Sequence, residues 1–410
     1  MKKIGLREKI QKSDFIHRRG CRACNSTDLE TYLDMGMMPL VNNYGNNNKY
    51  ELKVNLCKDC YLSQLSIVVD PDILFSNYFY QSSVSNKMSK HFEDFSCRLK
   101  EKLNLSPSSL AVDVASNDGI MLRGWKKIGV PSLGVDPARN LAEMANKEGL
   151  TTIVEYWQNV ELEKKADVIT AANVFAHTDD IGGFIKSVSK NLKHDGTFVL
   201  EFPHGQEFIL KREFDTIYHE HLSYILLNPL EKFLKIHDMY VFDVEKLDVH
   251  GGSLRVYSTR DQNRVKVSDS VKLLREEEQK HGLFDINTYH RFGQDVKDKK
   301  NNLYFIIKKL KRNSFIAGYA ASAKGNVLIN YCGFNNNDIK YVVDDNKDKQ
   351  GNLIPGTNIP VVSSEMLKKY PPKYLIILSW NIKEDILSKT KDYRDSGGEY
   401  ICPMPNIEVI

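Results

Sequence analysis

The sequence predicts an α/β protein with two doubly wound sheets behind a small N-terminal module. Two observations predict the sheets: short β-rich runs alternate with helical stretches over residues 110–202, and the same order returns from residue 315 onward. A third observation predicts the module, because CxxC pairs occur at residues 21–24 and 57–60. A length of 410 residues agrees with two or three domains.

Composition and charge narrow the classes of partner. The chain has 57 basic and 53 acidic residues, a net charge of +4, and no long block of one sign, which argues against nucleic acid as the main partner. No apolar run approaches the length of a membrane span, and the basic first twenty residues lack the apolar core of a secretory signal. We therefore expect a cytoplasmic protein without a membrane partner. The oligomeric state stays open, and a monomer is compatible with the sequence.

Four cysteines form the two CxxC pairs, and 32 residues separate one pair from the other. In a reducing compartment such pairs are metal ligands more often than disulfides. Four thiolates suit a closed tetrahedral zinc site with no open position, so we expect a structural Zn²⁺ that staples a module too small to build its own core. A redox pair or chance spacing is the alternative. The expected ligands are Cys21, Cys24, Cys57 and Cys60.

The N-terminal third contains two further features. Residues 1–20 read as a charged arm with helical character. The segment 70–85 is rich in aromatic and hydroxyl side chains, and its Tyr78 and Tyr80 either reach into a site or pack one module on the next. The expected domains are a zinc-binding module at 1–80, a central domain at 81–260 and a Rossmann-like C-terminal domain at 261–410.

The central domain is expected to follow a βα rhythm. A helix at 86–103 precedes it, and Asp195-Gly196 is the expected turn before the strand at 197–202. The other expected strands are 110–114, 132–135, 167–173, 240–248 and 253–259, and the other expected helices begin at 120, at 181 and near 229.

A small-residue loop, ASNDG, follows the first strand and opens a helix. This geometry brings backbone N–H groups against a nucleotide-like ligand, and an acid ending the second strand is placed to accept both hydroxyls of a ribose. The loop lacks a full GxGxxG, which argues against a nicotinamide dehydrogenase, and an ordinary βα turn is the alternative. The expected cofactor-binding residues at this edge are Asp113, Ala115, Asn117, Gly119, Asp136 and Asn173.

The stretch Tyr218-His219-Glu220-His221 carries a phenol, two imidazoles and a carboxylate within four residues. This set suits proton transfer near neutral pH, because histidine titrates there and a carboxylate can orient it. A polar turn whose histidines face water is the alternative. His177, in the loop after the strand at 167–173, is expected at the same sheet edge. The convergence of these groups with the cofactor loop favours a catalytic site.

The C-terminal part repeats the order strand, small-residue loop, helix, strand, acid. A charged helical connector at 261–312 leads to a strand at 315–319, a loop at 320–326 and a helix that ends near Tyr331. Lys324 in that loop either meets a phosphate or is solvated. His250 stands before two glycines that let backbone approach a ligand. Later strands are expected at 340–343 and 374–379.

These motifs together resemble a known family. The matching stretches run from Cys21 to beyond Pro360, and YHEHLSY and the AKGN stretch are the most diagnostic. The chain resembles the bacterial sugar C-methyltransferases that act on nucleotide-linked deoxysugars. DVASNDG departs from the glycine-rich methyltransferase loop by placing Ala115 and Asn117 at two glycine positions. The matching stretches are CRAC, LDMGMMPLVNNY, LCKDC, DVASNDG, GVDP, EFPHG, YHEHLSY, HGGSLRVY, GYAASAKGNVLINYCG and VVDDNKDKQGNLIPGTNIPV.

The resemblance implies methyl transfer from S-adenosylmethionine to a ring carbon next to the ketone of a nucleotide-linked keto-deoxysugar. Such a carbon becomes nucleophilic only after it loses a proton to form an enolate, which requires a base and oxyanion-stabilising groups. By the family pattern His221 is the expected base and Glu220 its orienting partner. The resemblance assigns the keto and hydroxyl oxygens to Tyr218, His177 and one of Tyr78 or Tyr80. Lys324 with its loop, and His250 before its two glycines, are the further substrate contacts that we expect.

Two other functions stay open at this point. The same architecture suits O-methylation of a nucleotide sugar, with the base removing a hydroxyl proton. The second is a non-catalytic protein that binds a nucleotide sugar, although the acid–base residues it would not need are present. No catalytic metal is required for either form of methyl transfer.

Overall fold

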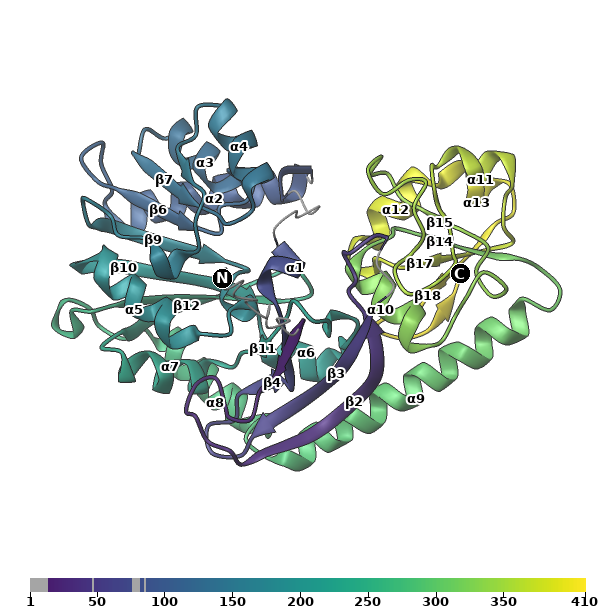
Figure 1. The fold of residues 1–410 in the computed structure, drawn as a ribbon, viewed down its shortest axis with the longest axis horizontal. Helices are drawn as coiled ribbons and strands as arrows, with labels where there is room; N and C mark the ends of the chain where they lie inside the picture. Colours follow the sequence, from purple (N-terminus) through teal and green to yellow (C-terminus); the bar gives the residue numbers. More distant parts are fainter. Residues whose placement is uncertain (1–13, 46–47, 76–81, 85) are drawn as a thin grey trace, which may run out of the picture.

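The computed structural model describes residues 14–45, 48–75, 82–84 and 86–410 (Figure 1). Tyr78 and Tyr80 lie outside the described residues. Within these ranges, no helix is long and apolar enough to cross a membrane.

The N-terminal module is built on a long twisted hairpin. β2 (Leu29–Pro39) pairs with β3 (Lys49–Cys57), and β4 (Ser63–Leu65) continues the sheet. The fourth strand is β11 (Ser223–Tyr224), which begins two residues after His221 and pairs with β4. The module therefore shares a sheet with the end of the YHEHLSY motif.

The prediction of a helical arm at residues 1–20 is wrong for the residues of this segment that the structure describes. Residues 15–17 form strand β1 (Phe15–His17), which pairs antiparallel with β5 (Ile67–Val69). Pairing with a buried strand outweighs the weak helical preference of a short charged segment.

The central sheet has the order β12-β13-β10-β9-β6-β7-β8, and β13 alone among its described strands runs opposite to the rest. The strand order reverses between β6 and β9, so the site is expected at the carboxyl ends of these two strands. The strands are β6 (Ala111–Val114), β7 (Ser132–Val135), β8 (Thr152–Ile153), β9 (Ala166–Ala172), β10 (Leu192–Pro203), β12 (Tyr240–Leu247) and β13 (Ser253–Thr259).

Helices cover both faces of this sheet, which confirms the doubly wound prediction. Val199 packs in the cluster that holds Trp125 of α3 (Ile120–Lys127) and Phe95 of α2 (Asn86–Leu103). Its neighbour Phe198 packs on the other face, with Phe184 of α5 (Ile181–Asn191). Successive strand residues point to opposite faces, so the near-continuous apolar runs of the sequence fill two cores. The other helices of this domain are α4 (Arg139–Lys147), α6 (Gly205–Lys211) and α7 (Leu227–Ile236).

One expected turn of the central domain is wrong. Asp195-Gly196 lies inside β10, where the pairing with β9 shifts register between Leu192 and Thr197. The strand accommodates these residues as an irregularity instead of ending there.

The C-terminal sheet has the order β16-β15-β14-β17-β18-β19, and its order also reverses beside the first strand, β14. Its strands are β14 (Ile316–Tyr319), β15 (Val342–Val343), β16 (Val361–Val362), β17 (Tyr374–Ile377), β18 (Glu399–Cys402) and β19 (Glu408–Val409). The loop expected at 320–326 is too long, because α10 (Ala323–Tyr331) begins at Ala323. Ser322 caps this helix by accepting a hydrogen bond from Gly325 N at 3.1 Å.

Two helices form the expected connector, α8 (Asp269–Lys280) and α9 (Ile286–Leu310). Figure 1 shows α9 running beneath both lobes beside the β2–β3 hairpin. The contact is close, because a Cβ atom on Gly293 of α9 would lie 2.2 Å from the carbonyl oxygen of Tyr32. The connector thus packs on the N-terminal module as well as on the central and C-terminal domains.

Candidate active site

The loop after β6 takes a conformation suited to close approach by a ligand. Ala115, Asn117 and Gly119 have φ values of 57°, 52° and 84°. Asp136, at the end of β7, accepts hydrogen bonds from the backbone N–H of Asn117 and of Ala138, both at 2.8 Å. Burial raises the pKa of Asp136 above its ordinary value. The acid after the second strand therefore fixes the loop that follows the first.

Two more of the predicted cofactor residues flank this loop. Asp113 is buried within the sheet and accepts a hydrogen bond from Thr170 Oγ1 at 2.5 Å, and burial raises its pKa to about 7. Asn173 has a φ of 56° and donates its backbone N–H to Glu201 O at 2.7 Å. Its side-chain Oδ1 is buried and has no hydrogen-bond partner in the part of the chain that is described. An orphaned acceptor at the sheet's switch point fits a ligand with an ammonium or hydroxyl donor, as S-adenosylmethionine has.

The segment that leads into α2 is fastened to the same loop. Ser82 N donates to Asn117 Oδ1 at 3.0 Å, and Ser83 N donates to Asp118 Oδ2 at 3.2 Å. The start of α2 therefore lies against the loop that follows β6.

His221 is held in one tautomer by its surroundings. Its Nδ1 lies 2.7 Å from the carbonyl oxygen of Thr216, which accepts only, so Nδ1 carries the hydrogen and Nε2 has the free lone pair. Its ring centroid is 4.0 Å from that of Tyr218 and 4.9 Å from that of His177. Burial, with His177 as a further cause, holds the pKa of His221 well below its ordinary value. The neutral ring is a base at physiological pH.

The other two residues of the motif face the N-terminal module. Glu220 is buried and accepts a hydrogen bond from Asn42 Nδ2 at 2.7 Å. His219 Nε2 lies 3.2 Å from the carbonyl oxygen of Glu51. These contacts, with the β11–β4 pairing, position His221 from both sides.

The four cysteines of the CxxC pairs come together. Their Sγ atoms all lie within 4.8 Å of one another, with 3.5 Å between Cys21 and Cys60 and 3.6 Å between Cys24 and Cys57. Four clustered thiols and no other ligand type fit a structural Zn²⁺. The first CxxC pair also contacts the site. Arg22, which follows Cys21, donates a hydrogen bond from Nε to Oδ1 of Asp179 at 2.9 Å, and Asp179 lies two residues after His177.

The C-terminal domain contributes a cation. Lys324 lies on the first turn of α10, and its Nζ is buried, with no hydrogen-bond partner among the described residues. This Nζ is 4.7 Å above the Trp380 ring, and Trp380 donates Nε1–H to Asp215 Oδ2 at 2.7 Å. After burial and His177, the Lys324 charge is a further cause of the low pKa of His221.

His250 lies near the same cation. It has a φ of 55° and precedes two glycines whose φ values are also positive. Burial first, and then the charge of Lys324, lowers the pKa of His250 to about 4. A Cβ atom on Gly251 would lie 2.4 Å from Glu213 Oε1, so this loop packs tightly on the neighbouring carboxyl group. The structure thus brings His250, Lys324 and His221 into one electrostatic neighbourhood.

Sequence reasoning missed a buried charge network at this edge. His91 Nε2 lies 2.6 Å from Glu201 Oε1, and Arg255 donates from Nε and Nη2 to Glu201 Oε2 at 2.9 and 2.7 Å. One signal was available, because Glu201 interrupts the apolar run FVLEF of a buried strand. Nothing in the pattern around His91 marks it.

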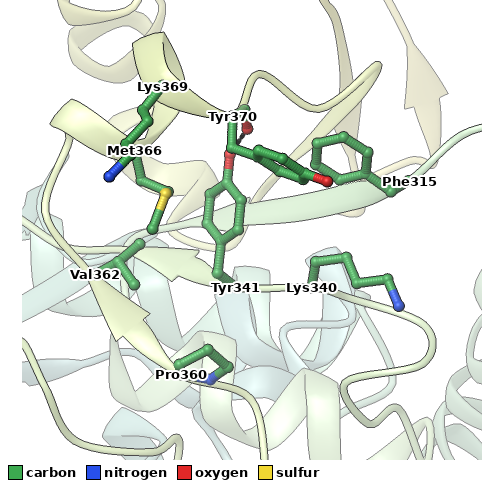
Figure 2. A pocket seen from close by; sticks show the side chains of 8 residues that line it. All are labelled: Phe315, Lys340, Tyr341, Pro360, Val362, Met366, Lys369 and Tyr370. Atoms are coloured by element: carbon green, nitrogen blue, oxygen red, sulfur yellow. Dashed lines mark hydrogen bonds between the residues drawn. The ribbon is translucent and has the colours of Figure 1, made fainter.

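A cavity of about 530 Å³ in the C-terminal domain lies away from this site (Figure 2). Phe315, Lys340 and Pro360 precede their strands, so the cavity lies at the amino ends of the sheet, whereas Lys324 follows a carboxyl end. The Phe315 and Tyr370 rings line it side by side with centroids 5.2 Å apart. Its walls carry no histidine or carboxylate, so we do not assign the reaction to it.

Three family models match successive parts of the chain. Residues 21–75 match a zinc binding domain, residues 81–238 a methyltransferase domain, and residues 248–405 a C-methyltransferase C-terminal domain. The first match contains the cysteine cluster, the second contains the β6 loop and His221, and the third contains His250 and Lys324.

Two solved methyltransferase structures match less than half of this chain, and one curated protein matches nearly all of it. A solved S-adenosylmethionine-dependent methyltransferase from Clostridium acetobutylicum shares 15% identity and a TM-score of 0.35, covering 42% of this chain and 91% of that one. Magnesium protoporphyrin IX methyltransferase from Synechocystis, with bound S-adenosylmethionine, shares 12% and a TM-score of 0.35, covering 42% and 79%. C-methyltransferase NovU from Streptomyces niveus is 31% identical over 404 residues, which cover 95% of this chain and 96% of that protein. The chain therefore belongs to the C-methyltransferase family and is an S-adenosylmethionine-dependent enzyme with a zinc-binding N-terminal module.

Proposed function

We propose that this enzyme methylates a ring carbon next to the ketone of a nucleotide-linked keto-deoxysugar, through an enolate that His221 forms. The observation that carries the proposal is the hydrogen bond that Nδ1–H of the half-buried His221 ring donates to Thr216 O, because it leaves the lone pair of the neutral Nε2 available. A C–H bond next to a ketone needs such a base before the carbon can attack a methyl group.

The chain's own residues divide the work in this proposal. His221 Nε2 takes the proton, while Tyr218 and His177, whose rings flank it, hold the keto and hydroxyl oxygens. Glu220 keeps the segment in place through the hydrogen bond that it accepts from Asn42. When bound, S-adenosylmethionine supplies an electrophilic methyl group on sulfur. Positioning of the two reactants then accounts for the remaining acceleration.

We assign the cofactor to the β6–β9 edge and the distal part of the substrate to the C-terminal lobe. The cofactor residues at the β6–β9 edge are Asp113, Ala115, Asn117, Gly119, Asp136 and Asn173. We place Lys324 and His250 among the substrate contacts, because the charge of Lys324 is, after burial, the next cause that lowers the pKa of His250. The buried ammonium of Lys324 has no acceptor in the described structure, which supports a ligand group as its partner.

Product analysis tests the proposal. Purified enzyme is incubated with S-adenosylmethionine and a panel of nucleotide-linked sugars with and without a 4-keto group, and products are read by mass spectrometry and NMR. We expect a mass gain of one methyl group only with keto sugars, with the new methyl on carbon. Methylation of an oxygen in plain hydroxyl sugars would replace the proposal with O-methylation, and cofactor binding without turnover of any sugar in the panel would overturn the proposed substrate class.

A further inference from the structure

Trp380 uses its indole N–H differently from the other two tryptophans of the chain. The N–H groups of Trp125 and Trp157 are buried in the central domain and have no hydrogen-bond partner among the described residues. Trp380 lies in the C-terminal domain and donates Nε1–H to Oδ2 of Asp215 at 2.7 Å, although 165 positions separate the two residues in the sequence. This hydrogen bond therefore joins two domains at a specific atom, whereas the other two rings serve packing.

The carboxyl group of Asp215 depends on this contact. Asp215 is fully buried and lies within the 3₁₀ helix η4 (Phe214–Thr216). Its other oxygen, Oδ1, has no hydrogen-bond partner in the part of the chain that is described. Without the indole N–H, the group would be buried with neither oxygen paired, and it would have to move toward water to recover a partner. The position of η4 is therefore coupled to Trp380.

The residue after Asp215 holds the proposed base. The carbonyl oxygen of Thr216 accepts the Nδ1–H of His221 at 2.7 Å. Both the N–H and the Oγ1–H of Thr216 donate to the carbonyl oxygen of Glu213, at 3.0 and 2.6 Å, so the turn is a compact unit. A shift of Asp215 therefore also shifts the carbonyl oxygen that sets the tautomer of His221.

Trp380 is itself fixed on the C-terminal domain. It opens η6 (Trp380–Ile382), which follows β17. The preceding residue, Ser379, donates Oγ–H at 2.8 Å to Oγ of Ser322, the residue that caps α10. Nζ of Lys324 lies 4.7 Å above the indole ring and restrains it from one face. The hydrogen bonds thus run from the cap of α10 through Trp380 and η4 to the base.

We propose that Trp380 is a positioning residue for the reaction, whose indole N–H holds Asp215 and, through Thr216, keeps the Nε2 lone pair of His221 directed at the substrate carbon. The inference deepens the proposed function and rests on it. It gives the C-terminal domain a part in proton removal in addition to the substrate contacts placed there. Trp380 touches neither reactant in this role, so its loss should slow proton removal without weakening sugar or cofactor binding.

A purely structural role would be to fasten the C-terminal domain to η4, which the rings of Phe214 and Tyr331 also do, with centroids 5.7 Å apart. Trp380→Phe removes the N–H and keeps a ring beneath Lys324. Trp125→Phe is the matched control, because it makes the same change in a fully buried ring whose N–H has no partner within the described ranges. We expect Trp125→Phe to lower the melting temperature and leave the rate unchanged.

Asp215 offers two further variants. Asp215→Asn keeps an oxygen that accepts the indole N–H and should stay within about threefold of the wild-type rate. Asp215→Ala removes the acceptor and should match Trp380→Phe. Because both changes break one hydrogen bond, the double variant should be no slower than the slower single variant. Losses that multiply in the double variant would mean that the two residues act independently, and would overturn the inference.

The test follows deuterium exchange into a nucleotide-linked 4-keto sugar in heavy water. A separate measurement reads the tautomer of His221 from NMR of the ring nitrogens in histidine-labelled enzyme, with His221→Asn to assign the signals. In Trp380→Phe we expect exchange to fall about 10- to 100-fold, with the KM for the sugar within about twofold of wild type and with signals of the Nε2–H tautomer. Trp125→Phe should keep wild-type exchange and the wild-type tautomer.

Two results would overturn the inference. One is wild-type exchange in Trp380→Phe. The other is slower exchange with an unchanged tautomer, which would place the effect of Trp380 outside the contact between Thr216 and His221. Wild-type enzyme that exchanges no sugar would instead overturn the proposed function, and the tautomer alone would then decide whether Trp380 positions His221.

Discussion

The first five strands of the central sheet and of the C-terminal sheet follow the same order, but the loop after the first strand differs between the two domains. Each sheet reverses order beside its first strand, and each places an acid after the second strand. In the central domain Asp136 holds the loop by accepting a hydrogen bond from the backbone N–H of Asn117. In the C-terminal domain Asp344 holds the corresponding loop by accepting a hydrogen bond from the backbone N–H of Ala321 at 2.7 Å. The shared contact explains why both loops look like ligand sites in the sequence.

The difference is in what else reaches the loop. In the C-terminal domain the carbonyl oxygen of Ala321 accepts hydrogen bonds from Lys349 Nζ at 2.9 Å and from Tyr44 of the N-terminal module at 3.0 Å. In the central domain Asn173 Oδ1, beside the loop, has no partner within the described ranges. We infer that one loop binds a ligand, whereas the other fastens the domain and presents Lys324 to the site. On this inference, the same topology serves ligand binding in the central domain and positioning in the C-terminal domain.

The largest expected effect is the loss of the base. His221→Asn keeps a donor for Thr216 O but has no basic nitrogen, so kcat should fall by about 10³. S-adenosylmethionine affinity, measured by calorimetry, should stay within about twofold of wild type. The exposed His194 is the control, and His194→Asn should be neutral. A His221→Asn enzyme with more than a tenth of wild-type kcat would move the chemistry elsewhere.

Zinc removal is expected to affect stability and activity together. Cys57→Ser should abolish stoichiometric zinc and lower the melting temperature by about 10 °C or more, because the metal replaces a core that the module lacks. Activity should also fall, since Arg22 of the first CxxC pair holds Asp179 beside His177. Cys97→Ser, outside the cluster, should keep full zinc by atomic absorption. Full zinc in Cys57→Ser would contradict the four-cysteine site.

The comparison of the two loops predicts an asymmetric response to matched changes. An amide has one acceptor oxygen, so Asp136→Asn leaves the N–H of Asn117 or Ala138 unpaired at a cost of about 1–3 kcal/mol. We expect S-adenosylmethionine to bind about tenfold more weakly in Asp136→Asn and unchanged in Asp344→Asn, by calorimetry. Equal weakening in both variants would mean that the C-terminal loop also binds the cofactor.

The smallest expected effect concerns pH. His221 acts as a base only when neutral, and a lowered pKa extends the neutral form toward acid, so kcat/KM should stay nearly constant from pH 8 down to 6.5. The acid limb should have its midpoint below the ordinary histidine value of 6.5. A midpoint above 6.5 would mean that a carboxylate, and not burial, dominates the environment of the base.

Much of the architecture could be predicted because it is local. The βα rhythm, the four cysteines and the His221 motif are patterns of neighbouring residues, and the structure confirms the sheets and the cysteine cluster. The network of His91, Glu201 and Arg255 could not be predicted, since its members are 54 or more residues apart. The pairing of β11 with the N-terminal module depends on chain folding over similar distances. Residue type signals chemistry, but only the fold decides which groups meet.

The most direct test of the central claim is proton exchange without methyl transfer. Wild-type enzyme is incubated in heavy water with a nucleotide-linked 4-keto sugar and S-adenosylhomocysteine, and deuterium beside the ketone is followed by NMR. We predict that wild-type enzyme incorporates one deuterium at the carbon that is later methylated and that His221→Asn incorporates none. Exchange at the same rate in both proteins, or carbon methylation without any exchange, would contradict it.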